Sequence, residues 1–512
     1  MMEYSRLVAV LEIGSTGIRL LVAEILGASE WRAVDQAEKN VALGRDVFTS
    51  GSISRESLLE CLLVLKNYRE LLGGWGIRDE DIHIIATSAL RAARNRDLFM
   101  DRVRHETGFG ISIVEGIEEN RLMYLAVRFA LKQDLPLFWR SNSMIIEIGG
   151  GSTEIMLLRR GKMVAAHSLG LGTILIDQQS RLGPASGRFQ ERYLNENIGR
   201  TAGFLSAELD LGHIRTFVVV GSDARLISYL AGGELNEDCR IIGRQSFIGL
   251  VERIQDYTVE ECVRILNISY AHAEGLLPSI RIYRFFLEQT DAAQVVVPLV
   301  SIREGFLLDL VLGVDSELQE DFYSQIIASA VNLGRRYHYD EGHGRHVADL
   351  CLALFDALSR EHGMSRRERM MLETAAILHD IGGYIRGADH HKHGQYIVAN
   401  SEIFGLQPEE LGVIASVIRY HRGEAPSRGD IGYLALQRTD RILVLKLASL
   451  LRVADALDRG HTQQIKTISL ERRGETMVIH TEGVHDLSLE QISMEQKADL
   501  FQDVFGYKVI LN

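Results

Sequence analysis

Two segments of the chain combine an acidic residue with a turn of small residues, as a phosphate site that uses a metal ion requires. Glu12 lies two residues before the turn Gly14-Ser15-Thr16-Gly17, and Glu147 lies two residues before Gly149-Gly150-Gly151-Ser152-Thr153. Apolar strand patterns flank both turns. Backbone amides in a glycine-rich turn can point together at an anion, because no side chain blocks the approach. The repeat predicts two halves of one phosphate site, although either turn alone is more typical of an ordinary hairpin.

The two glutamates occupy equivalent positions in this repeat. If the two halves close on one another, the carboxylates of Glu12 and Glu147 face each other across a cleft. Mg²⁺ suits such a place, because it binds oxygen ligands, keeps several waters and joins one or two carboxylates to substrate phosphate. We therefore expect a Mg²⁺ site in the cleft.

Histidines and aspartates of the C-terminal half form a second group with the residue types of a metal site. His346 opens one helical pattern, His379-Asp380 closes another, and Asp455 lies at the edge of a third. Imidazole and carboxylate from three helices can hold one divalent ion and leave positions open for water and phosphate. These four residues resemble the ligand set of the HD phosphohydrolase superfamily, which implies a second hydrolytic centre with an ion such as Mn²⁺. The histidines expected to support the ligands or contact phosphate are His390, His393 and His421.

Chance offers an alternative for this second group. A His-Asp dipeptide is common, and Asp455 can be a solvated neighbour of a core-facing helical stripe. Nine of the 17 histidines, however, fall between His338 and His421. This concentration favours metal binding.

The elements that must position these groups change character near residue 315. Before it, strand patterns alternate with helical patterns such as Arg55–Leu72 and Glu118–Leu131, which is typical of an α/β sheet covered by helices. After it, amphipathic helices follow one another, and from Ile465 two strands, a helix and a final strand indicate a small α/β tail. The patterns predict a first lobe at residues 1–132, a second lobe at 133–314, an all-helical domain at 315–462 and an α/β subdomain at 463–512.

Composition excludes several classes of protein. The 512 residues are 46% hydrophobic and 24% charged, which is typical of a globular chain of several domains and not of a disordered or fibrous one. No apolar run approaches the roughly 20 residues that span a bilayer, and no secretory signal is visible. The four scattered cysteines favour a reduced, cytoplasmic setting. A net charge of −13 argues against a general nucleic-acid coat, so a polyanionic ligand needs a locally basic groove.

Four short motifs occur in the order Thr87-Ser88-Ala89-Leu90-Arg91, Gly116-Ile117-Glu118-Glu119-Asn120-Arg121, Ile148-Gly149-Gly150-Gly151-Ser152-Thr153-Glu154 and Arg303-Glu304-Gly305. Together they resemble the exopolyphosphatase / guanosine pentaphosphate phosphohydrolase family. The resemblance implies two ribonuclease-H-like lobes, as in the actin-like, sugar-kinase-like and chaperone-like ATPase folds. It also implies a helical HD-type domain after the lobes, and it covers essentially the whole chain.

The resemblance assigns roles to individual residues. It implies that Glu119 is the general base for the attacking water, that Arg91 contacts the phosphoryl group, and that Glu154 joins the cleft ligands. The alternatives are that Glu119 is a helix-start carboxylate and Arg91 a surface arginine. The residues implied to bind phosphate are Gly14, Ser15, Gly149, Gly150, Gly151, Ser152 and Thr153.

Departures from the family pattern leave the activity of the cleft open. The family usually has aspartate where this chain has Glu12 and Glu147, an Asn-Ser pair at Thr16-Gly17, and a small neutral residue at Asp223. One extra methylene moves a metal by about 1 Å, and such a shift can cost about a hundredfold in rate. A compensated active site and a weakened, binding-only site are both compatible with this.

The leading interpretation is a Mg²⁺-dependent phosphohydrolase that removes terminal phosphate from inorganic polyphosphate. One alternative is the same chemistry on guanosine pentaphosphate. Another is a polyphosphate- or nucleotide-binding sensor that hydrolyses only in the HD-type domain. The resemblance also implies a homodimer.

Overall fold

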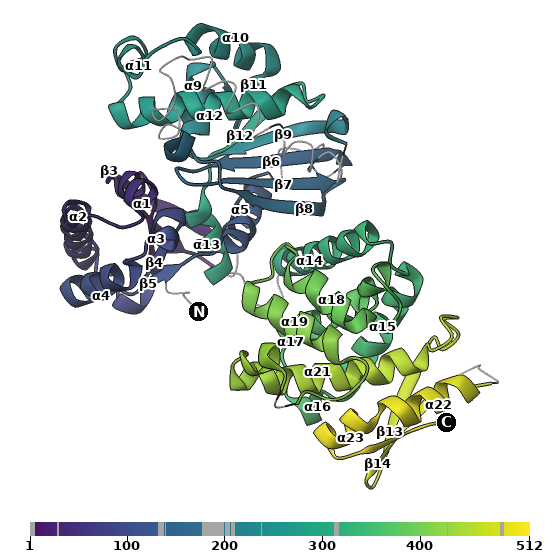
Figure 1. Cartoon of the computed structure of the whole chain (residues 1–512). Helices are drawn as coiled ribbons and strands as arrows, with labels where there is room; N and C mark the ends of the chain where they lie inside the picture. Colours follow the sequence, from purple (N-terminus) through teal and green to yellow (C-terminus); the bar gives the residue numbers. More distant parts are fainter. Residues whose placement is uncertain are drawn as a thin grey trace. The chain divides into compact units, whose positions relative to one another are not determined.

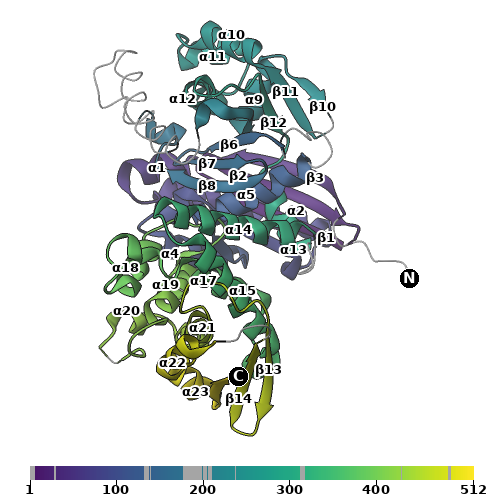
Figure 2. The ribbon, with the colours of Figure 1, turned by 90° about the vertical axis from the view of Figure 1, so that its right-hand side faces the viewer.

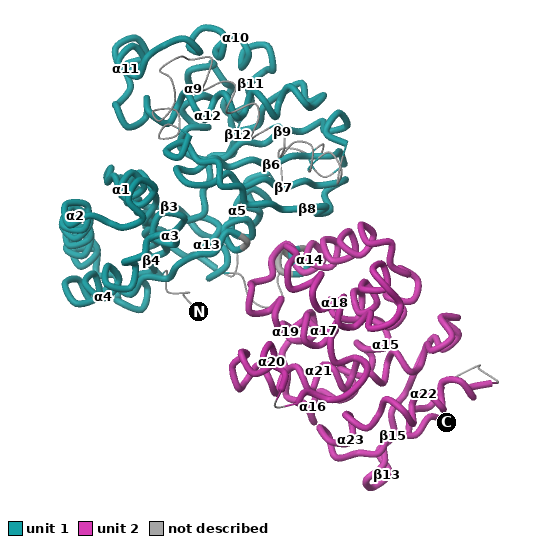
Figure 3. The backbone as a smooth tube through the Cα atoms, in the orientation of Figure 1, with its two compact units in different colours: residues 1–322 teal, residues 323–512 magenta. Residues whose placement is uncertain are grey.

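The computed structural model describes the chain except for residues 1–5, 28–29, 132–137, 139, 177–198, 200–204, 206–209, 237, 312–316, 428 and 482–485. The chain divides into two compact units, residues 1–322 and 323–512 (Figure 3). The predicted boundaries at 132/133 and 314/315 lie outside the described residues, so the four-domain division stays a prediction.

Unit 1 contains two mixed sheets with matching strand order (Figure 1). The first has the order β3-β2-β1-β4-β5, and the second has the order β10-β11-β12-β9-β6-β7-β8. In each sheet an antiparallel hairpin, β1–β2 or β6–β7, lies beside a strand that runs parallel to its first strand. The strands of the first sheet are β1 (Arg6–Ile13), β2 (Gly17–Ile25), β3 (Trp31–Asn40), β4 (Ile82–Ala86) and β5 (Ile111–Ile113).

The second sheet repeats this plan and extends it. Its strands are β6 (Asn142–Ile148), β7 (Thr153–Arg159), β8 (Lys162–Leu169), β9 (Ile214–Val220), β10 (Glu234–Asn236), β11 (Cys239–Gly243) and β12 (Gln294–Pro298). β1 and β6 are central strands and are buried almost throughout, as expected for apolar runs covered on both faces. The repeat read from the sequence is therefore a structural duplication.

Helices separate the strands of unit 1, as the alternating pattern predicted. Those of the first half are α1 (Leu43–Ser50), α2 (Arg55–Gly74), α3 (Ser88–Ala92), α4 (Arg96–Thr107) and α5 (Gly116–Ala130). Those of the second half are α9 (Ser222–Leu230), α10 (Arg244–Ile254), α11 (Val259–Leu266) and α12 (Tyr270–Glu288). The predicted helices over Arg55–Leu72 and Glu118–Leu131 match α2 and α5 to within two residues at each end.

A last helix, α13 (Ile302–Val311), returns from the second sheet and packs against α5 and β1 of the first half. The motif Arg303-Glu304-Gly305 lies in the first turn of this helix, and all three residues are buried. Glu304 accepts hydrogen bonds from the backbone and the hydroxyl of Ser301, at 2.8 and 2.5 Å. A Cβ atom at Gly305 would overlap the carbonyl of Leu122 on α5. The glycine therefore lets two helices approach more closely than a side chain would permit.

Unit 2 consists of helices followed by a small sheet. Its elements are α14 (Glu317–Arg336), which begins in unit 1 and continues into unit 2 from Tyr323, α15 (Glu341–Ala357), α16 (Ser359–His362), α17 (Arg366–Leu378), η3 (Ile381–Tyr384), α18 (His390–Ala399), α19 (Pro408–Tyr420), α20 (Ile431–Leu434), α21 (Arg438–Leu457), β13 (Ile468–Arg473), β14 (Thr476–Thr481), α22 (Ser488–Lys497), α23 (Asp499–Phe505) and β15 (Lys508–Leu511). The tail has two helices where the sequence predicted one, because Ala498 separates α22 from α23.

The tail of unit 2 packs on its helices. Both α22 and α23 contact α21, and Figure 2 shows them beside it with the β13–β14 hairpin. Arg452 of α21 is buried and donates to the carbonyls of Tyr420 and Gly423 and to Asp499 of α23. The small α/β tail and the helices thus share one interior.

No helix among the described residues combines the length and apolar character needed to cross a bilayer. All four cysteines are buried and free.

We predict that Gly305→Ala lowers the free energy of unfolding by about 1–3 kcal/mol, because the new methyl group must push α13 away from α5. Gly73→Ala in α2 is the matched control, since nothing lies within 4 Å of its Cβ position. It should be neutral or stabilise by up to about 1 kcal/mol. Chemical denaturation followed by circular dichroism measures both, and equal stability of the two variants would contradict the packing argument.

Candidate functional site

The two glycine turns have the same geometry and lie against each other. The amide of Gly14 donates to the carbonyl of Gly17 at 2.9 Å, and the amide of Gly149 donates to the carbonyl of Ser152 at 2.8 Å. A Cβ atom at Gly150 would lie 2.7 Å from the Cβ of Ser15. This close approach leaves no room for a side chain at position 150, and it brings the amide-rich turns of both halves to one point.

A cavity of about 840 Å³ opens at this point. Both turns line it, together with Thr87, which joins β4 to α3, and Ser88, the first residue of α3. The hydroxyl oxygens of Ser15 and Ser88 are 3.1 Å apart. The predicted site residues that line the cavity are Glu12, Gly14, Ser15, Glu119, Glu147, Gly149, Gly150, Ser152 and Glu154.

Glu119 lies in the first turn of α5 and is buried at the cavity wall. Arg91 of α3 donates from Nη1 to Glu119 Oε2 at 2.8 Å and to the carbonyl of Val114 at 2.5 Å. Burial raises the pKa of Glu119, and the guanidinium of Arg91 opposes that rise. Arg91 is not among the residues that line the cavity. In this structure it therefore holds the carboxylate of Glu119.

Glu147 and Glu154 form a pair of like charges directly opposite each other on β6 and β7. Glu154 accepts hydrogen bonds from Asn120 Nδ2 at 3.0 Å and from Ser168 Oγ at 2.7 Å. Burial, followed by repulsion from Glu119, raises the pKa of Glu154 to about 8. Burial and the neighbouring carboxylates also raise the pKa of Glu147 well above its ordinary value. A crowded set of carboxylate oxygens of this kind fits a hard divalent cation such as Mg²⁺.

The equivalent pair in the first half is different. Glu12 lies opposite Arg19 on β1 and β2, with Arg19 Nη1 3.4 Å from Glu12 Oε1. The buried Arg303 of α13 approaches the other oxygen, with its Nε 3.5 Å from Glu12 Oε2. Sequence reasoning gave neither arginine a role in the site, although Arg303 belongs to one of the four motifs. Arg19 could have been recognised from the predicted hairpin. It follows Glu12 by seven residues and lies opposite it in the strand register.

Two predicted phosphate ligands are not among the residues that line the cavity. Gly151 packs against Phe48, since a Cβ there would overlap the phenyl ring. Thr153 is buried, and its hydroxyl donates to the carbonyl of Leu171. Asp223, the departure noted in the sequence, does line the cavity and accepts a hydrogen bond from Ser279 at 2.6 Å. Burial raises the pKa of Asp223.

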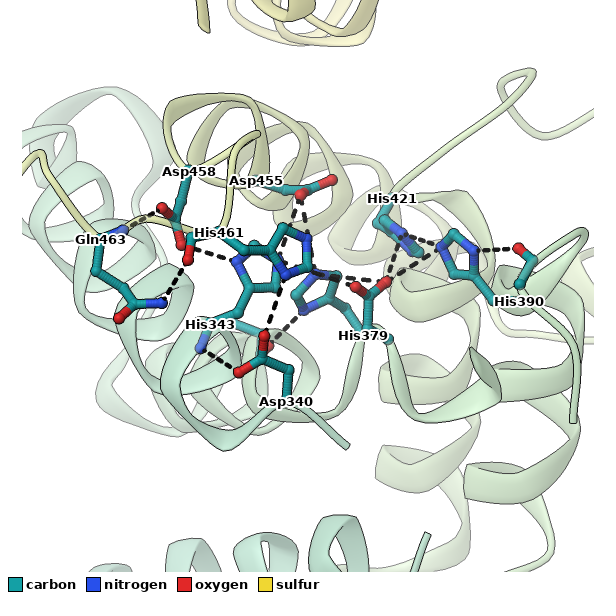
Figure 4. Close-up of polar contacts among 12 residues, drawn as sticks. Asp340, His343, His379, His390, His421, Asp455, Asp458, His461 and Gln463 are labelled. Atoms are coloured by element: carbon teal, nitrogen blue, oxygen red, sulfur yellow. Dashed lines mark hydrogen bonds and ion pairs between the residues drawn. The ribbon is translucent and has the colours of Figure 1, made fainter. Parts of the chain in front are cut away.

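Unit 2 gathers a second set of histidines and aspartates (Figure 4). Three overlapping groups among the described residues have donor atoms within 4.8 Å of one another. Their members are His343, His379 and Asp380; His379, His421 and Asp455; and Asp380, His390 and His421. Burial, followed by repulsion from His379, lowers the pKa of His421 to about 3, so this ring is neutral and has a lone pair to offer.

Of the predicted ligands in unit 2, the structure brings together His379, Asp380 and Asp455, but not His346. His343, one turn earlier on α15, lies in its place. The sequence analysis placed the start of this helix at His346, whereas the helix begins at Glu341 and Asp340 caps it by accepting from the amide of His343 at 3.0 Å. Asp340 could have indicated the earlier helix start, because aspartate is a preferred N-cap residue. His390 and His421 join the groups, and His393 does not.

Comparisons with known proteins agree with the site in unit 1. The Ppx/GppA phosphatase family profile matches residues 21–313, and the profile of domain III of Ppx/GppA phosphatases matches residues 327–500. A guanosine-5'-triphosphate,3'-diphosphate pyrophosphatase of Pseudoalteromonas translucida is 23% identical over 98% of each chain. A relative of the same name from Pseudoalteromonas atlantica is 24% identical over 87% of this chain and 86% of its own.

Among solved structures, an exopolyphosphatase of Cytophaga hutchinsonii superposes with a TM-score of 0.54 at 18% identity. The match covers 61% of this chain and 100% of that one, and it shows a shared fold. The profile matches extend over more than half of the residues, and the site has the glycine turns and carboxylates described above. The chain therefore belongs to the Ppx/GppA phosphatase family, whose members are hydrolases that act on phosphoanhydride bonds.

Proposed function

We propose that the cavity of unit 1 removes the terminal phosphoryl group of inorganic polyphosphate by attack of water, with Glu119 as the general base. The observation that carries this proposal is the position of Glu119, a buried carboxylate in the wall of a cavity that both glycine-rich turns line. A base next to an anion site is what water attack on a bound phosphoryl group requires.

Each residue then has a defined task. The amides of the two turns and the hydroxyls of Ser15 and Ser88 bind the terminal phosphate. Glu119 accepts a proton from the water, whose oxygen forms the new bond to phosphorus while the phosphoanhydride bond breaks. The shortened polyphosphate leaves with the bridging oxygen, and orthophosphate is the second product. Arg91 orients Glu119 through the 2.8 Å hydrogen bond.

Glu147 and Glu154, with Glu12, are the residues that would hold Mg²⁺. When bound, this ion neutralises charge on the transferring phosphoryl group. Arg19 and Arg303 already offset the charge of Glu12. The extra methylene of Glu147 relative to aspartate is therefore the departure most relevant to metal position.

Guanosine pentaphosphate is the second candidate substrate. The names of the relatives that match the chain along nearly its whole length favour it. The carboxyl group of Asp223 on the cavity wall also offers an acceptor to the hydrogen-bond donors of a nucleotide, which polyphosphate lacks. A sensor that binds without cleaving in unit 1 is the third candidate.

Other parts of the proposal concern the whole protein. We propose a cytoplasmic homodimer with ribonuclease-H-like lobes in unit 1 and an HD-type helical domain in unit 2. In that domain His343, His379, Asp380 and Asp455 hold a divalent ion such as Mn²⁺, with His343 taking the place expected for His346.

We predict that Glu119→Gln lowers kcat for phosphate release by about 10²–10⁴-fold, the usual contribution of a general base. Glu118→Gln is the matched control, because Glu118 pairs with Arg121 and is not among the cavity-lining residues. It should keep most of the wild-type rate. Orthophosphate release from polyphosphate and from guanosine pentaphosphate is measured with each variant. Equal rates for both variants would refute the role of Glu119.

The same assay separates the candidate substrates. A larger kcat/KM for polyphosphate than for guanosine pentaphosphate supports the leading proposal, and the reverse order supports the nucleotide. Tight binding of either compound without phosphate release identifies a sensor.

The pH dependence of kcat should follow the ionisation of Glu119. A base must be ionised, so activity falls as pH drops through a pKa that burial raises. Arg91→Met removes the charge that opposes this rise, which moves the acid limb to higher pH. Arg91→Lys keeps a positive charge and should move it less. Profiles of kcat against pH for the two variants test this, and coincident acid limbs would show that Arg91 does not control Glu119.

A further inference from the structure

Four arginines line the cavity of unit 1, and protein groups bind three of them. These three pairs, each given by its shortest contact, are Arg19 with Glu38 at 2.9 Å, Arg45 with Glu274 at 2.6 Å and Arg303 with Ser301 at 3.2 Å. The guanidinium of the fourth, Arg225, has neither a hydrogen bond nor an ion pair with any residue that the structure describes. It is therefore the cation of the cavity wall that a ligand can engage without displacing a protein partner.

Arg225 lies near the start of α9, the helix that follows β9. β9 runs parallel to β6 and beside it, so both strands end at the same edge of the sheet. A Cβ atom at Gly221, the residue before α9, would lie 3.8 Å from the carbonyl oxygen of Ile148 at the end of β6. The start of α9 is thus next to the glycine turn that follows β6. An anion bound by Arg225 lies beside the terminal phosphate that this turn is proposed to bind.

The charges around Arg225 favour a bound anion. Burial, followed by repulsion from Arg303, lowers the pKa of Arg225, and Arg19 adds to the repulsion. Glu304 and Glu38 oppose this fall, but both carboxylates are bound to other groups. A partly buried cation without a partner is costly, and an anion that binds it removes part of this cost.

Asp223, in the first turn of α9, does not neutralise Arg225. Its Oδ2 accepts from Ser279 Oγ of α12 at 2.6 Å, and a Cβ atom at Gly275 of the same helix would lie 2.8 Å from this oxygen. The carboxyl group is therefore held against α12. Burial raises the pKa of Asp223, which favours its uncharged form and reduces its repulsion of an anion bound nearby.

The cavity also has room beyond the terminal phosphate. Its volume is about 840 Å³, and cavities of about 300–1,000 Å³ hold ligands of drug size. The two turns account for one end of the substrate. The rest of the space must then receive the groups that follow the terminal phosphate.

We propose that Arg225 binds the phosphate groups on the leaving-group side of the scissile bond. The inference rests on the hydrolysis proposed for unit 1, in which the glycine turns hold the terminal group. A planar guanidinium can donate two parallel hydrogen bonds to one phosphate, and it keeps its charge when partly buried. Inorganic polyphosphate and guanosine pentaphosphate both carry a chain of phosphates behind the terminal one, so this chain is the shared ligand. Arg225 contacts the part of the substrate that leaves.

Binding of tripolyphosphate to full-length Glu119→Gln tests this role. Isothermal titration calorimetry in excess Mg²⁺ gives the Kd of tripolyphosphate, and competition gives the Kd of orthophosphate, which occupies the terminal position alone. Adding Arg225→Met should weaken tripolyphosphate binding by about 10–100-fold, the usual effect of losing a charge-assisted pair, and change orthophosphate binding by less than about threefold. Unchanged binding of tripolyphosphate, or equal weakening of both ligands, would overturn the proposal.

Two further variants separate a phosphate contact from a general effect of charge or folding. Arg253→Met is the matched control, because Arg253 is exposed on α10, does not line the cavity and carries the same charge. It should leave both Kd values unchanged, and a loss equal to that of Arg225→Met would overturn the assignment. Arg225→Lys keeps the charge without the planar fork, so its loss should be intermediate. Circular dichroism checks the folding of each variant.

Guanosine pentaphosphate is titrated in the same way to distinguish the two sources of the phosphate chain. An equal loss with tripolyphosphate and guanosine pentaphosphate supports one path for both chains. A loss confined to tripolyphosphate supports polyphosphate as the ligand of Arg225. A loss confined to guanosine pentaphosphate would place the contact elsewhere on the nucleotide and overturn the proposal.

Failure of the proposed hydrolysis has a different signature. If Glu119 is not the base, Glu119→Gln still releases orthophosphate from tripolyphosphate. The role of Arg225 is then measured from KM, which Arg225→Met should raise by about 10–100-fold while Arg253→Met leaves it unchanged. An unchanged KM in Arg225→Met would overturn the inference, whatever the role of Glu119.

Discussion

The contact between the two glycine turns is the constraint on which unit 1 depends. Ser15 and Gly150 approach so closely that only a hydrogen atom fits at position 150. The two sheets must therefore present their hairpins to each other at one fixed place. α13 contributes to the same arrangement, because Gly305 lets it lie against α5, the helix that carries Glu119. The proposed general base and the two glycine-rich turns are thus positioned by backbone packing rather than by long side chains.

The duplicated halves are alike in backbone and different in charge. Glu12 and Glu147 occupy equivalent strand positions, but the residue opposite Glu12 is Arg19 and the residue opposite Glu147 is Glu154. The first half therefore neutralises its glutamate with protein cations, whereas the second half concentrates negative charge. If the proposed Mg²⁺ binds in the cleft, this asymmetry favours ligands from the second half. Burial, followed by repulsion from neighbouring carboxylates, raises the pKa values of Glu147 and Glu154.

In unit 2, acceptors at the ends of helices hold the histidine side chains in place. Backbone carbonyls at the ends of α17 and α19 accept from His379 and His421, so each helix end fixes the tautomer of its own histidine. Asp458, just beyond α21, does the same for His343. The result is a set of buried ring nitrogens that face the carboxylates of Asp380 and Asp455 inside unit 2. Such a set suits a cation among the rings, which is why we propose metal binding by these helices.

The sequence by itself determined the features that depend on local residue patterns, namely the two hairpins and the buried strands. The repeat of strand, acidic residue and turn identified both hairpins, and the buried positions of β1 and β6 follow from their apolar runs. Local pattern does not separate His346, the predicted ligand, from His343, because the two lie only three residues apart on α15, on neighbouring faces of the helix. Packing against α21, where Asp458 accepts from His343, decides which ring faces inward. The partners of Glu12 could likewise be identified only from the tertiary structure. Arg303, which contacts it, lies near the C-terminal end of unit 1 and is far from Glu12 in the sequence. Local periodicity fixes the elements, but contacts between distant segments depend on how those elements pack.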